Sequence, residues 1–190
     1  MAINLVGNGL YNVKQYKDAL SVREATLSLV QRIGTTENNI LGVQGNLANL
    51  YGRLGRHESA LRIKREIYAR RVELYGATDE DSLLAAGNLA STLVEDLEQF
   101  DETRAFLQDR IPEAIGALGK NHDLTFKLQR MHAQCLFENA GASLEDVTAA
   151  IAALEDLDRR MTRIFGAAHP QTDTTRFFLE EAREKLARAK

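Results

Sequence analysis

Residues 34–48 read GTTENNILGVQGNLA and residues 76–90 read GATDEDSLLAAGNLA, so the two stretches align without a gap at an offset of 42 residues. Further copies of the pattern begin at Gly119 and Gly166, which gives spacings of 42, 43 and 47 residues between successive glycines. Self-similarity at a period of this length indicates a repeat architecture, in which each unit is one supersecondary element that stacks on its neighbours.

Each copy predicts a pair of helices. The first helix opens just after its glycine with a polar residue that satisfies free N–H groups of the first turn; these residues are Thr36, Thr78, Asn121 and His169, the last followed by Pro170. The second helix follows a turn, which lies at residues 55–57 in the first full copy, and carries small and apolar residues at helical spacing. Gly76 closes it, as expected of a left-handed residue past a helix end.

Two irregularities interrupt this pattern. The copies that are longer than 42 residues are expected to place their added residues between the two helices, near Glu98 and near residues 139–142, because loops tolerate insertions. Pro112 falls inside a second helix and removes one backbone hydrogen bond. We expect a kink or break near Arg110 and Ile111, which would tilt the last repeats relative to the first.

Composition excludes several classes of protein. The chain has 27 acidic and 24 basic residues, and basic residues are interleaved with acids, so a nucleic-acid surface is not expected. No apolar run approaches the roughly 18–20 residues that cross a bilayer, and the N-terminus does not read as a secretion signal. Cys135 is the only cysteine, which suits a reducing compartment. These features predict a cytoplasmic protein with no membrane partner.

Motifs for catalysis are weak. Residues 116–121 (GALGKN) lack the glycine spacing and the Ser or Thr of a phosphate loop. His132 and Cys135 share a helical face with Glu138, but packing is favoured over a metal site. His122 and His169 occupy equivalent positions of the repeat, which favours a structural role for both. The sequence therefore predicts no enzyme, no cofactor and no metal.

The run Asn-Leu-Ala-x-x-Tyr-x-x-x-Gly-x-x-x-x-Ala-Leu at residues 46–61 resembles the tetratricopeptide (TPR) repeat. The 42-residue spacing, the Gly-x-x-His-Pro-x-Thr segment at residues 166–172 and the Asn-Leu-Ala triplets are similar to the longer TPR variant of kinesin light chains. The resemblance implies an all-α fold, an α-α superhelix or solenoid of stacked antiparallel helix pairs. One such solenoid would span residues 1–190, with a partial unit at 1–34, units at 35–76, 77–119 and 120–166, and a final helix or cap at 167–190.

The N-terminal unit departs from the family pattern. Asn4-Leu5-Val6 already stands at the Asn-Leu-Ala position, so its first helix lacks about eight to ten residues. Two interpretations stay open: the N-terminus is an atypical cap, or the chain is cut from a longer array. An uncapped N-terminal repeat would favour self-association through its open apolar face.

The resemblance also implies a peptide-binding groove lined by the first helices of the units. The Asn of each Asn-Leu-Ala triplet would face it, with neighbours one helical turn away; the expected contact residues are Asn46, Asn49, Arg53, Leu84, Asn88, Ser91, Lys127, Met131 and Gln134. Asn49, Asn88 and Lys127 stand at three positions of the carboxylate clamp of some TPR domains, whereas Gly45 and Met131 replace two of its cations. Such a site would hold a carboxylate more weakly than a complete clamp does.

These observations lead to two functional hypotheses. The first is a protein–protein interaction module that takes a peptide or helix of a partner into the concave groove. The alternative is a structural spacer or self-association segment of a longer repeat protein, with no peptide ligand of its own. The motif that resembles the TPR repeat specifies the architecture and does not identify the partner.

Overall fold

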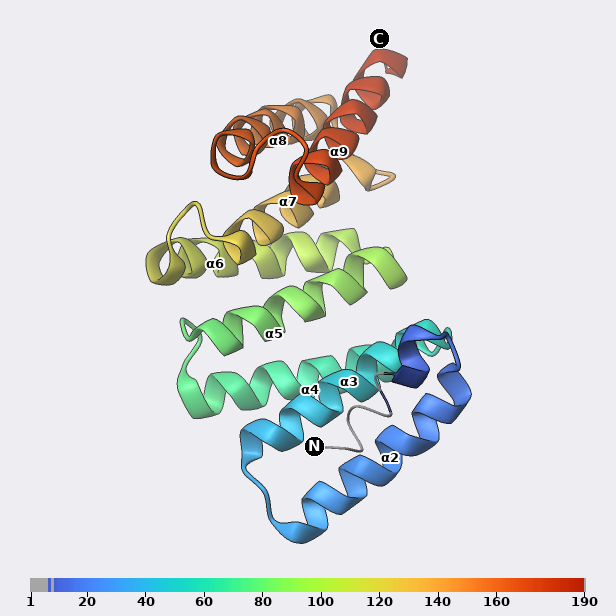
Figure 1. The fold of residues 1–190 in the computed structure, drawn as a ribbon. Coiled ribbons are helices and arrows are strands. Elements are labelled where there is room, and N and C mark those ends of the chain that lie inside the picture. Colours follow the sequence, from blue (N-terminus) through green and yellow to red (C-terminus); the bar gives the residue numbers. More distant parts are fainter. Residues whose placement is uncertain (1–6, 8, 190) are drawn as a thin grey trace. The chain divides into compact units, whose positions relative to one another are not determined.

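The computed structural model describes residue 7 and residues 9–189, and the regular structure in this part of the chain is helical (Figure 1). The expectation for residues 4–6 lies outside the described residues. The helices run in the order α2 (Tyr16–Ile33), α3 (Glu37–Arg53), α4 (His57–Tyr75), α5 (Glu80–Ser91), a π-helix η1 (Thr92–Asp96), α6 (Phe100–Leu118), α7 (Asp123–Glu138), α8 (Leu144–Phe165) and α9 (Pro170–Arg188).

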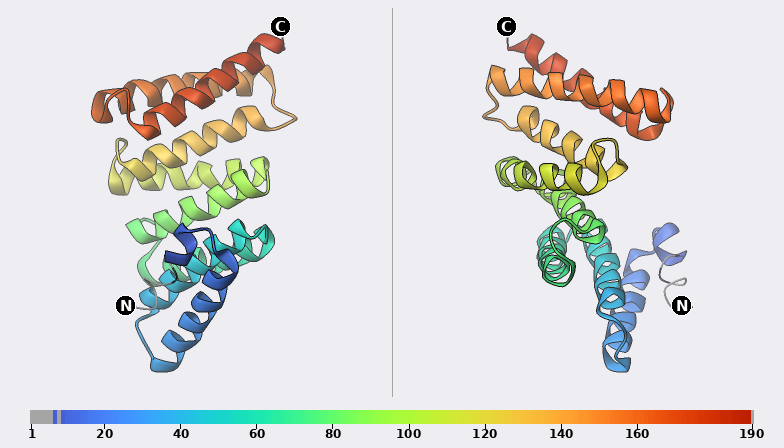
Figure 2. Two further views of the ribbon diagram at one scale, coloured as in Figure 1. Left: turned by 45° about the vertical axis from the view of Figure 1, so that its right-hand side comes forward. Right: turned by 90° about the vertical axis from the view of Figure 1, so that its left-hand side faces the viewer.

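The chain divides into two compact units, residues 1–74 and residues 75–190. In the first, α2 packs on α3, and α4 is joined to α3 by an ion pair between Arg70 and Glu37 at 2.7 Å. In the second, each helix from α5 to α9 packs on the next one along the chain (Figure 2). In addition, α5 contacts α7, and α7 contacts α9. Each unit is therefore a stack of helix pairs, and the predicted all-α solenoid class is confirmed.

Glycine punctuates the repeats as predicted. Gly34, Gly76, Gly119 and Gly166 have φ angles of 71°, 87°, 92° and 90°. These angles lie in the left-handed region, where any other residue would strain its Cβ against the backbone. The glycine that the sequence repeats every 42 to 47 residues is thus the residue that reverses the chain between consecutive units.

The predicted helix caps need two corrections of one residue each. His169 is an N-cap as expected; Thr36 stands at the N-cap position of α3, but its side chain accepts no backbone N–H; and the caps of α5 and α7 are Asp79 and His122, in place of Thr78 and Asn121. The Asp79 carboxylate accepts a hydrogen bond from the Asp81 backbone N–H at 2.9 Å. The added negative charge also suits the positive end of the helix dipole, which favours Asp79 over the neighbouring threonine.

The added residues are accommodated partly within helices. Asn46 and Asn88 are 42 residues apart, whereas α4 and α6 begin 43 residues apart, so the first added residue lies between Asn88 and Phe100. The π-helix Thr92–Asp96 occupies this interval, and a π turn is the usual result of one residue inserted into an α-helix. Further on, α8 has 22 residues where α6 has 19, so the prediction that all added residues lie in loops was wrong.

Pro112 does not break its helix. α6 is continuous from Phe100 to Leu118 with the proline inside it, so a break near Arg110 and Ile111 is contradicted, whereas a kink there stays a prediction. Packing explains this, because Leu107 and Ala114 on either side of Pro112 are fully buried. Both belong to a hydrophobic cluster with Leu83, Leu128 and Met131, and burial of that face outweighs one lost backbone hydrogen bond.

Candidate functional site

The candidate site is a pocket of about 400 Å³ on the first helices of the units in residues 75–190. It lies over α5, the N-terminal half of α7 and the start of α9, and these three helices follow one another in the stack. The residues that line it are Glu80, Leu84, His122, Asp123, Leu124, Lys127, Arg130 and Gln171. A volume in this range is typical of sites that take small ligands or single side chains.

Two cations dominate the electrostatics of the pocket. Lys127 and Arg130 are half-buried, and burial lowers the pKa of both side chains, partly offset by attraction to the Glu95 carboxylate. Among the residues that the structure describes, neither side chain forms a hydrogen bond or an ion pair. The Arg130 guanidinium lies over the Phe178 ring at 5.9 Å, which holds it in place without neutralising it. Unpaired, partly desolvated cations bind carboxylates well.

Apolar surface adjoins these cations. The Leu84 side chain is 46% exposed, although it sits in a helix whose other leucines, such as Leu83 and Leu89, are almost fully buried. Leu124 lies beside it in the pocket and is 8% exposed. An exposed leucine next to two cations suits a ligand that carries an apolar side chain close to a carboxylate.

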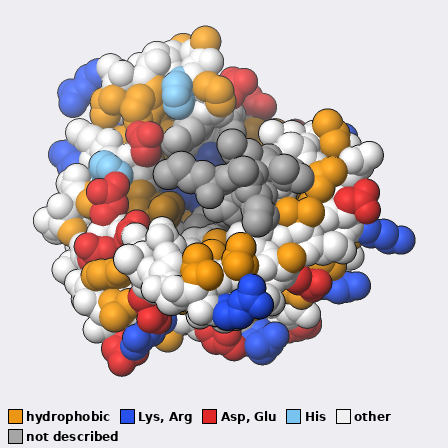
Figure 3. Space-filling view, turned by 60° about the horizontal axis from the view of Figure 1, so that its bottom comes forward, with side chains coloured by type: hydrophobic (Ala, Val, Ile, Leu, Met, Phe, Trp, Pro, Cys, Tyr) orange, Lys and Arg blue, Asp and Glu red, His pale blue; other side chains and the backbone are white. Residues whose placement is uncertain are grey.

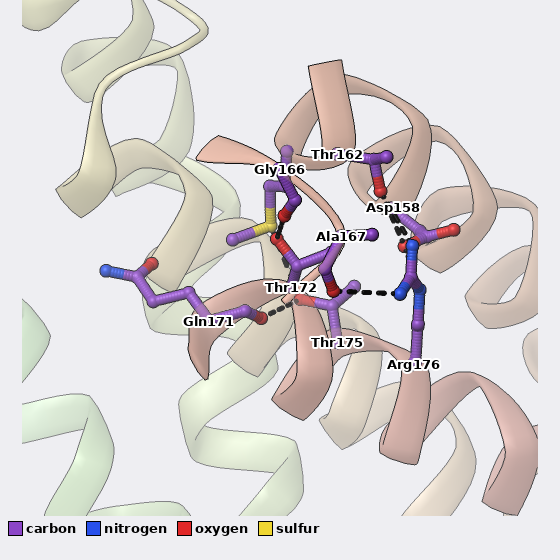
Figure 4. A network of polar contacts seen from close by, with 9 residues as sticks. Asp158, Thr162, Gly166, Ala167, Gln171, Thr172, Thr175 and Arg176 are labelled. Carbon is purple, nitrogen blue, oxygen red and sulfur yellow. Dashed lines mark hydrogen bonds and ion pairs between the residues drawn. The ribbon is translucent and has the colours of Figure 1, made fainter. Parts of the chain in front are cut away.

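The turn between α8 and α9 positions the third wall of the pocket. Arg176 donates to Asp158 at 2.8 Å, to the Thr162 hydroxyl at 2.9 Å and to the Ala167 carbonyl at 3.0 Å (Figure 4). Thr172 donates to the Gly166 carbonyl across the same turn. Gln171 lies at the edge of this network and its side chain points away from Arg176 (Figure 4). Its Oε1 atom is buried without a hydrogen-bond partner among the described residues.

The structure brings some of the predicted contact residues together. Leu84 and Lys127 line the same pocket, and the Ser91 hydroxyl donates to the Met131 sulfur at 3.5 Å. Asn88 is exposed on α5. Met131 is 2% exposed and belongs to the core.

The remaining predicted residues are placed differently. Gln134 is 8% exposed, and its amide is bonded to the Glu138 carboxylate at 3.0 Å. Asn46, Asn49 and Arg53 are exposed on α3, in the unit formed by residues 1–74, and the Arg53 Nε donates to the Tyr11 hydroxyl at 2.9 Å. A ligand contact by any of these residues stays a prediction.

Arg130, His122 and Gln171 were missed as site residues. Arg130 follows Lys127 by three residues, so helical spacing alone places it on the same face of α7. His122 caps α7 through its Nδ1 atom, which accepts from the Leu124 N–H at 3.3 Å, and its Nε2 atom lies 4.0 Å from Glu80. No sequence signal indicates that Gln171 lies beside them, because that depends on the turn before α9.

Other chemistry has little support in the described part of the chain. No group of three or more His, Cys, Asp or Glu side chains is arranged there to hold a metal ion. Within residue 7 and residues 9–189, no helix combines the length and apolar character needed to cross a membrane. Burial raises the pKa of the Cys135 thiol to about 12, so it is a poor nucleophile at neutral pH. Acidic and basic side chains are interspersed on the face shown in Figure 3.

Comparisons with known proteins agree with this architecture. A model of the tetratricopeptide repeat family matches residues 40–81. The fold is similar to the nearly identical TPR-like repeats of a kinesin light chain candidate from Podosopora anserina, solved as a point variant, with a TM-score of 0.80, 16% identity, and coverage of 98% of this chain and 86% of that one.

A second structure of those repeats has a TM-score of 0.77 at the same identity and coverage. BtubC (BKLC) from P. vanneervenii has a TM-score of 0.65, with 15% identity over 98% of this chain and 76% of that one. No curated protein matches the sequence.

Proposed function

We propose, from the premise that the chain is a tetratricopeptide repeat protein of the kinesin light chain type, that it binds a peptide of a protein partner at the pocket on α5, α7 and α9. TPR repeats generally mediate protein–protein interactions, and the fold is of a scaffold type. The finer assignment rests on one observation: Lys127 and Arg130 line this pocket as half-buried cations without hydrogen bonds or ion pairs among the described residues.

The chemistry of the pocket specifies the peptide. A carboxylate, from an acidic side chain or a C-terminus, would lie between the two cations. Burial removes water from both side chains, and a carboxylate replaces the lost contacts with charge-assisted hydrogen bonds. An apolar side chain next to it would cover the exposed Leu84. The Gln171 side chain lines the same pocket, and its amide would add a hydrogen bond to the peptide backbone. The expected ligand is therefore an extended segment with an acidic and an apolar residue close together.

The test is a selection of peptides from a random library on the intact protein, followed by measurement of affinity for the best peptide. Replacing the peptide's acid by its amide, or introducing Lys127→Met, is expected to weaken binding about 10- to 100-fold, since each removes a charge-assisted contact worth roughly 1.5–3 kcal/mol. Lys120→Met is the matched control, because Lys120 is exposed on the same unit and outside the pocket.

Two outcomes would count against this assignment. If the selected peptides bind Lys127→Met and Arg130→Met variants as tightly as the wild type, the peptide site lies elsewhere on the protein. If repeated selections yield no peptide at all, the spacer or self-association hypothesis is favoured.

A further inference from the structure

Arg130 is held in the candidate site on α5, α7 and α9 through the face of its guanidinium. The guanidinium lies over the Phe178 ring, 5.9 Å from the ring centroid, and Arg130 lines the pocket. A guanidinium is planar, and its N–H groups all point outward in that plane. A contact through the face therefore leaves these N–H groups to bind an acceptor, and none of them forms a hydrogen bond or an ion pair among the described residues.

Phe178 is itself held by two further rings. The centroid of the Phe137 ring lies 6.4 Å from that of Phe178 at an angle of 61°, and the Phe177 centroid lies 5.6 Å away at 68°. Phe137 is 3% exposed and belongs to the hydrophobic cluster of α7, α8 and α9, against which Phe178 packs. The ring under Arg130 is thus fixed by the core and has little freedom to move.

The repeat gives Phe178 a defined position on its helix. It stands twelve residues after Gly166, as Asn88 stands twelve residues after Gly76. Asn88 is exposed on α5, whereas Phe178 is half-buried and contacts both the core and Arg130. At this position α9 therefore carries a ring that contacts an arginine of α7, in place of a polar amide.

Arginines lie over aromatic rings elsewhere in residues 75–190, but those guanidinium groups also donate hydrogen bonds within the protein. Arg110 lies over the Phe106 ring at 5.6 Å and donates to the Glu113 carboxylate at 3.0 Å. Arg160 lies over the Phe126 ring at 5.0 Å, and each of its three nitrogens donates a hydrogen bond. The arginine of the candidate site combines the same kind of ring contact with N–H groups that no described residue engages.

The ring contact matters because recognition of a carboxylate by arginine is directional. A carboxylate is planar and accepts two parallel N–H bonds from a guanidinium, whereas a lysine ammonium acts as a point charge. An arginine side chain that is free to rotate must be ordered when the ligand binds, and this ordering lowers the affinity. A ring that already holds the guanidinium reduces that cost before the ligand arrives.

We propose that Phe178 is a positioning residue of the candidate site: its ring holds the face of the Arg130 guanidinium, so that the N–H groups are presented to a ligand carboxylate. This inference rests on the proposed function, because it takes a peptide carboxylate as the ligand. It assigns the directional contact to Arg130, and Lys127 then supplies charge without directing the carboxylate.

The experiment uses the full chain and two probes, N-acetyl-Leu-Asp-amide and its neutral counterpart N-acetyl-Leu-Asn-amide, titrated in ¹H–¹⁵N spectra that include the Arg130 Nε–H signal. The wild type is expected to bind the aspartate probe at least about tenfold more tightly than the asparagine probe. The Arg130 Nε–H signal is expected to shift with the aspartate probe alone, a result that needs no variant.

Variants of Phe178 test the role of the ring. Phe178→Leu keeps an apolar side chain but removes the ring, and it is expected to weaken binding of the aspartate probe alone, by about three- to tenfold. Phe178→Tyr keeps the ring and is expected to bind as the wild type does. Arg130→Lys keeps the charge but not the planar group, and we expect a loss similar to that of Phe178→Leu. Phe106→Leu is the matched control, because it removes the ring under Arg110, outside the pocket, and should leave binding unchanged.

The outcomes separate this inference from the proposed function. If Arg130→Met and Lys127→Met remove the preference for aspartate but Phe178→Leu keeps it, the site stands and the role of Phe178 is overturned. Equal weakening of both probes by Phe178→Leu would show that the ring has only a structural role, which also overturns the inference. If the wild type binds both probes equally, or neither, the carboxylate site itself is wrong and the inference fails with it.

Discussion

Two histidines in residues 75–190 cap the N-termini of helices. The Nδ1 atoms of His122 and His169 each accept a backbone N–H two residues ahead, at 3.3 Å in both cases. The same position before α5 holds Asp79, whose carboxylate does the same. An imidazole that caps a helix through Nδ1 has used its basic nitrogen, which argues against a role as a catalytic base at these positions.

His169 offers a test of this capping role. His169→Ala removes the cap of α9 and the stack of the imidazole on the Phe165 ring, whose centroids are 4.8 Å apart. We expect a loss of about 1–2 kcal/mol in the free energy of unfolding, measured with urea. His169→Asn keeps a capping side chain and should lose about half as much. Equal losses would show that the cap contributes little and the stack nearly everything.

Lys127, in the pocket on α5, α7 and α9, links burial to stability. Its folded-state pKa is lowered, first by burial and then by Arg130, so between that value and 10.5 the unfolded chain binds more protons than the folded one. The free energy of unfolding contributed by this group therefore rises as pH increases across that window. The difference between wild type and Lys127→Met, measured by denaturation from pH 7 to 10.5, should grow in favour of the wild type with pH. A constant difference would contradict it.

At the scale of helices, the sequence predicts where elements start better than it predicts their length. Glycine and the polar residues after it determine each first helix to within one residue, because left-handed backbone and free N–H groups demand particular side chains. A spacing of 47 residues does not say whether the additions extend a loop or a helix. That choice depends on packing, and α8 is the longer because Leu154, Leu157 and Met161 are buried along it.

The same limit applies to the candidate site. Leu84 and Lys127 were predictable from their face of the helix, but Met131 and Gln134 on the same predicted face are buried. The cause is that α7 contacts α5, α6, α8 and α9, so little of its circumference reaches solvent. A periodic pattern of apolar residues identifies the buried face of a helix that packs on one neighbour. The pattern no longer separates buried from exposed residues when four neighbouring helices surround the helix.

Pro112 lowers the stability of its own helix. Pro112→Ala restores a backbone donor and a better helix former, so we expect the free energy of unfolding to rise by about 1–3 kcal/mol. Thermal denaturation followed by circular dichroism measures it, with Ala117→Pro, at an exposed position of the same helix, expected to act in the opposite direction. No gain with Pro112→Ala would mean that the structure around α6 has adapted to the ring.

At the scale of the whole chain, residues 75–190 contain what a small domain needs. Two hydrophobic clusters lie within this unit, one around Leu83 and Leu128, the other around Phe126, Leu154 and Leu179, and the candidate site on α5, α7 and α9 is lined by its residues alone. We expect a fragment of residues 75–190 to be helical and to unfold cooperatively, as shown by circular dichroism and dispersed NMR spectra. A fragment without a cooperative transition would show that the unit needs residues 1–74.

The left-handed glycines have a consequence for how such a chain changes in length. Gly76, Gly119 and Gly166 each stand three residues before the capping residue of the next helix. On both sides of residues 77–119 the glycine φ angle is close to 90°, and the N–H of the capping residue donates to the glycine carbonyl. Unequal recombination between gene copies that duplicated or deleted residues 77–119 would therefore recreate an existing type of junction each time.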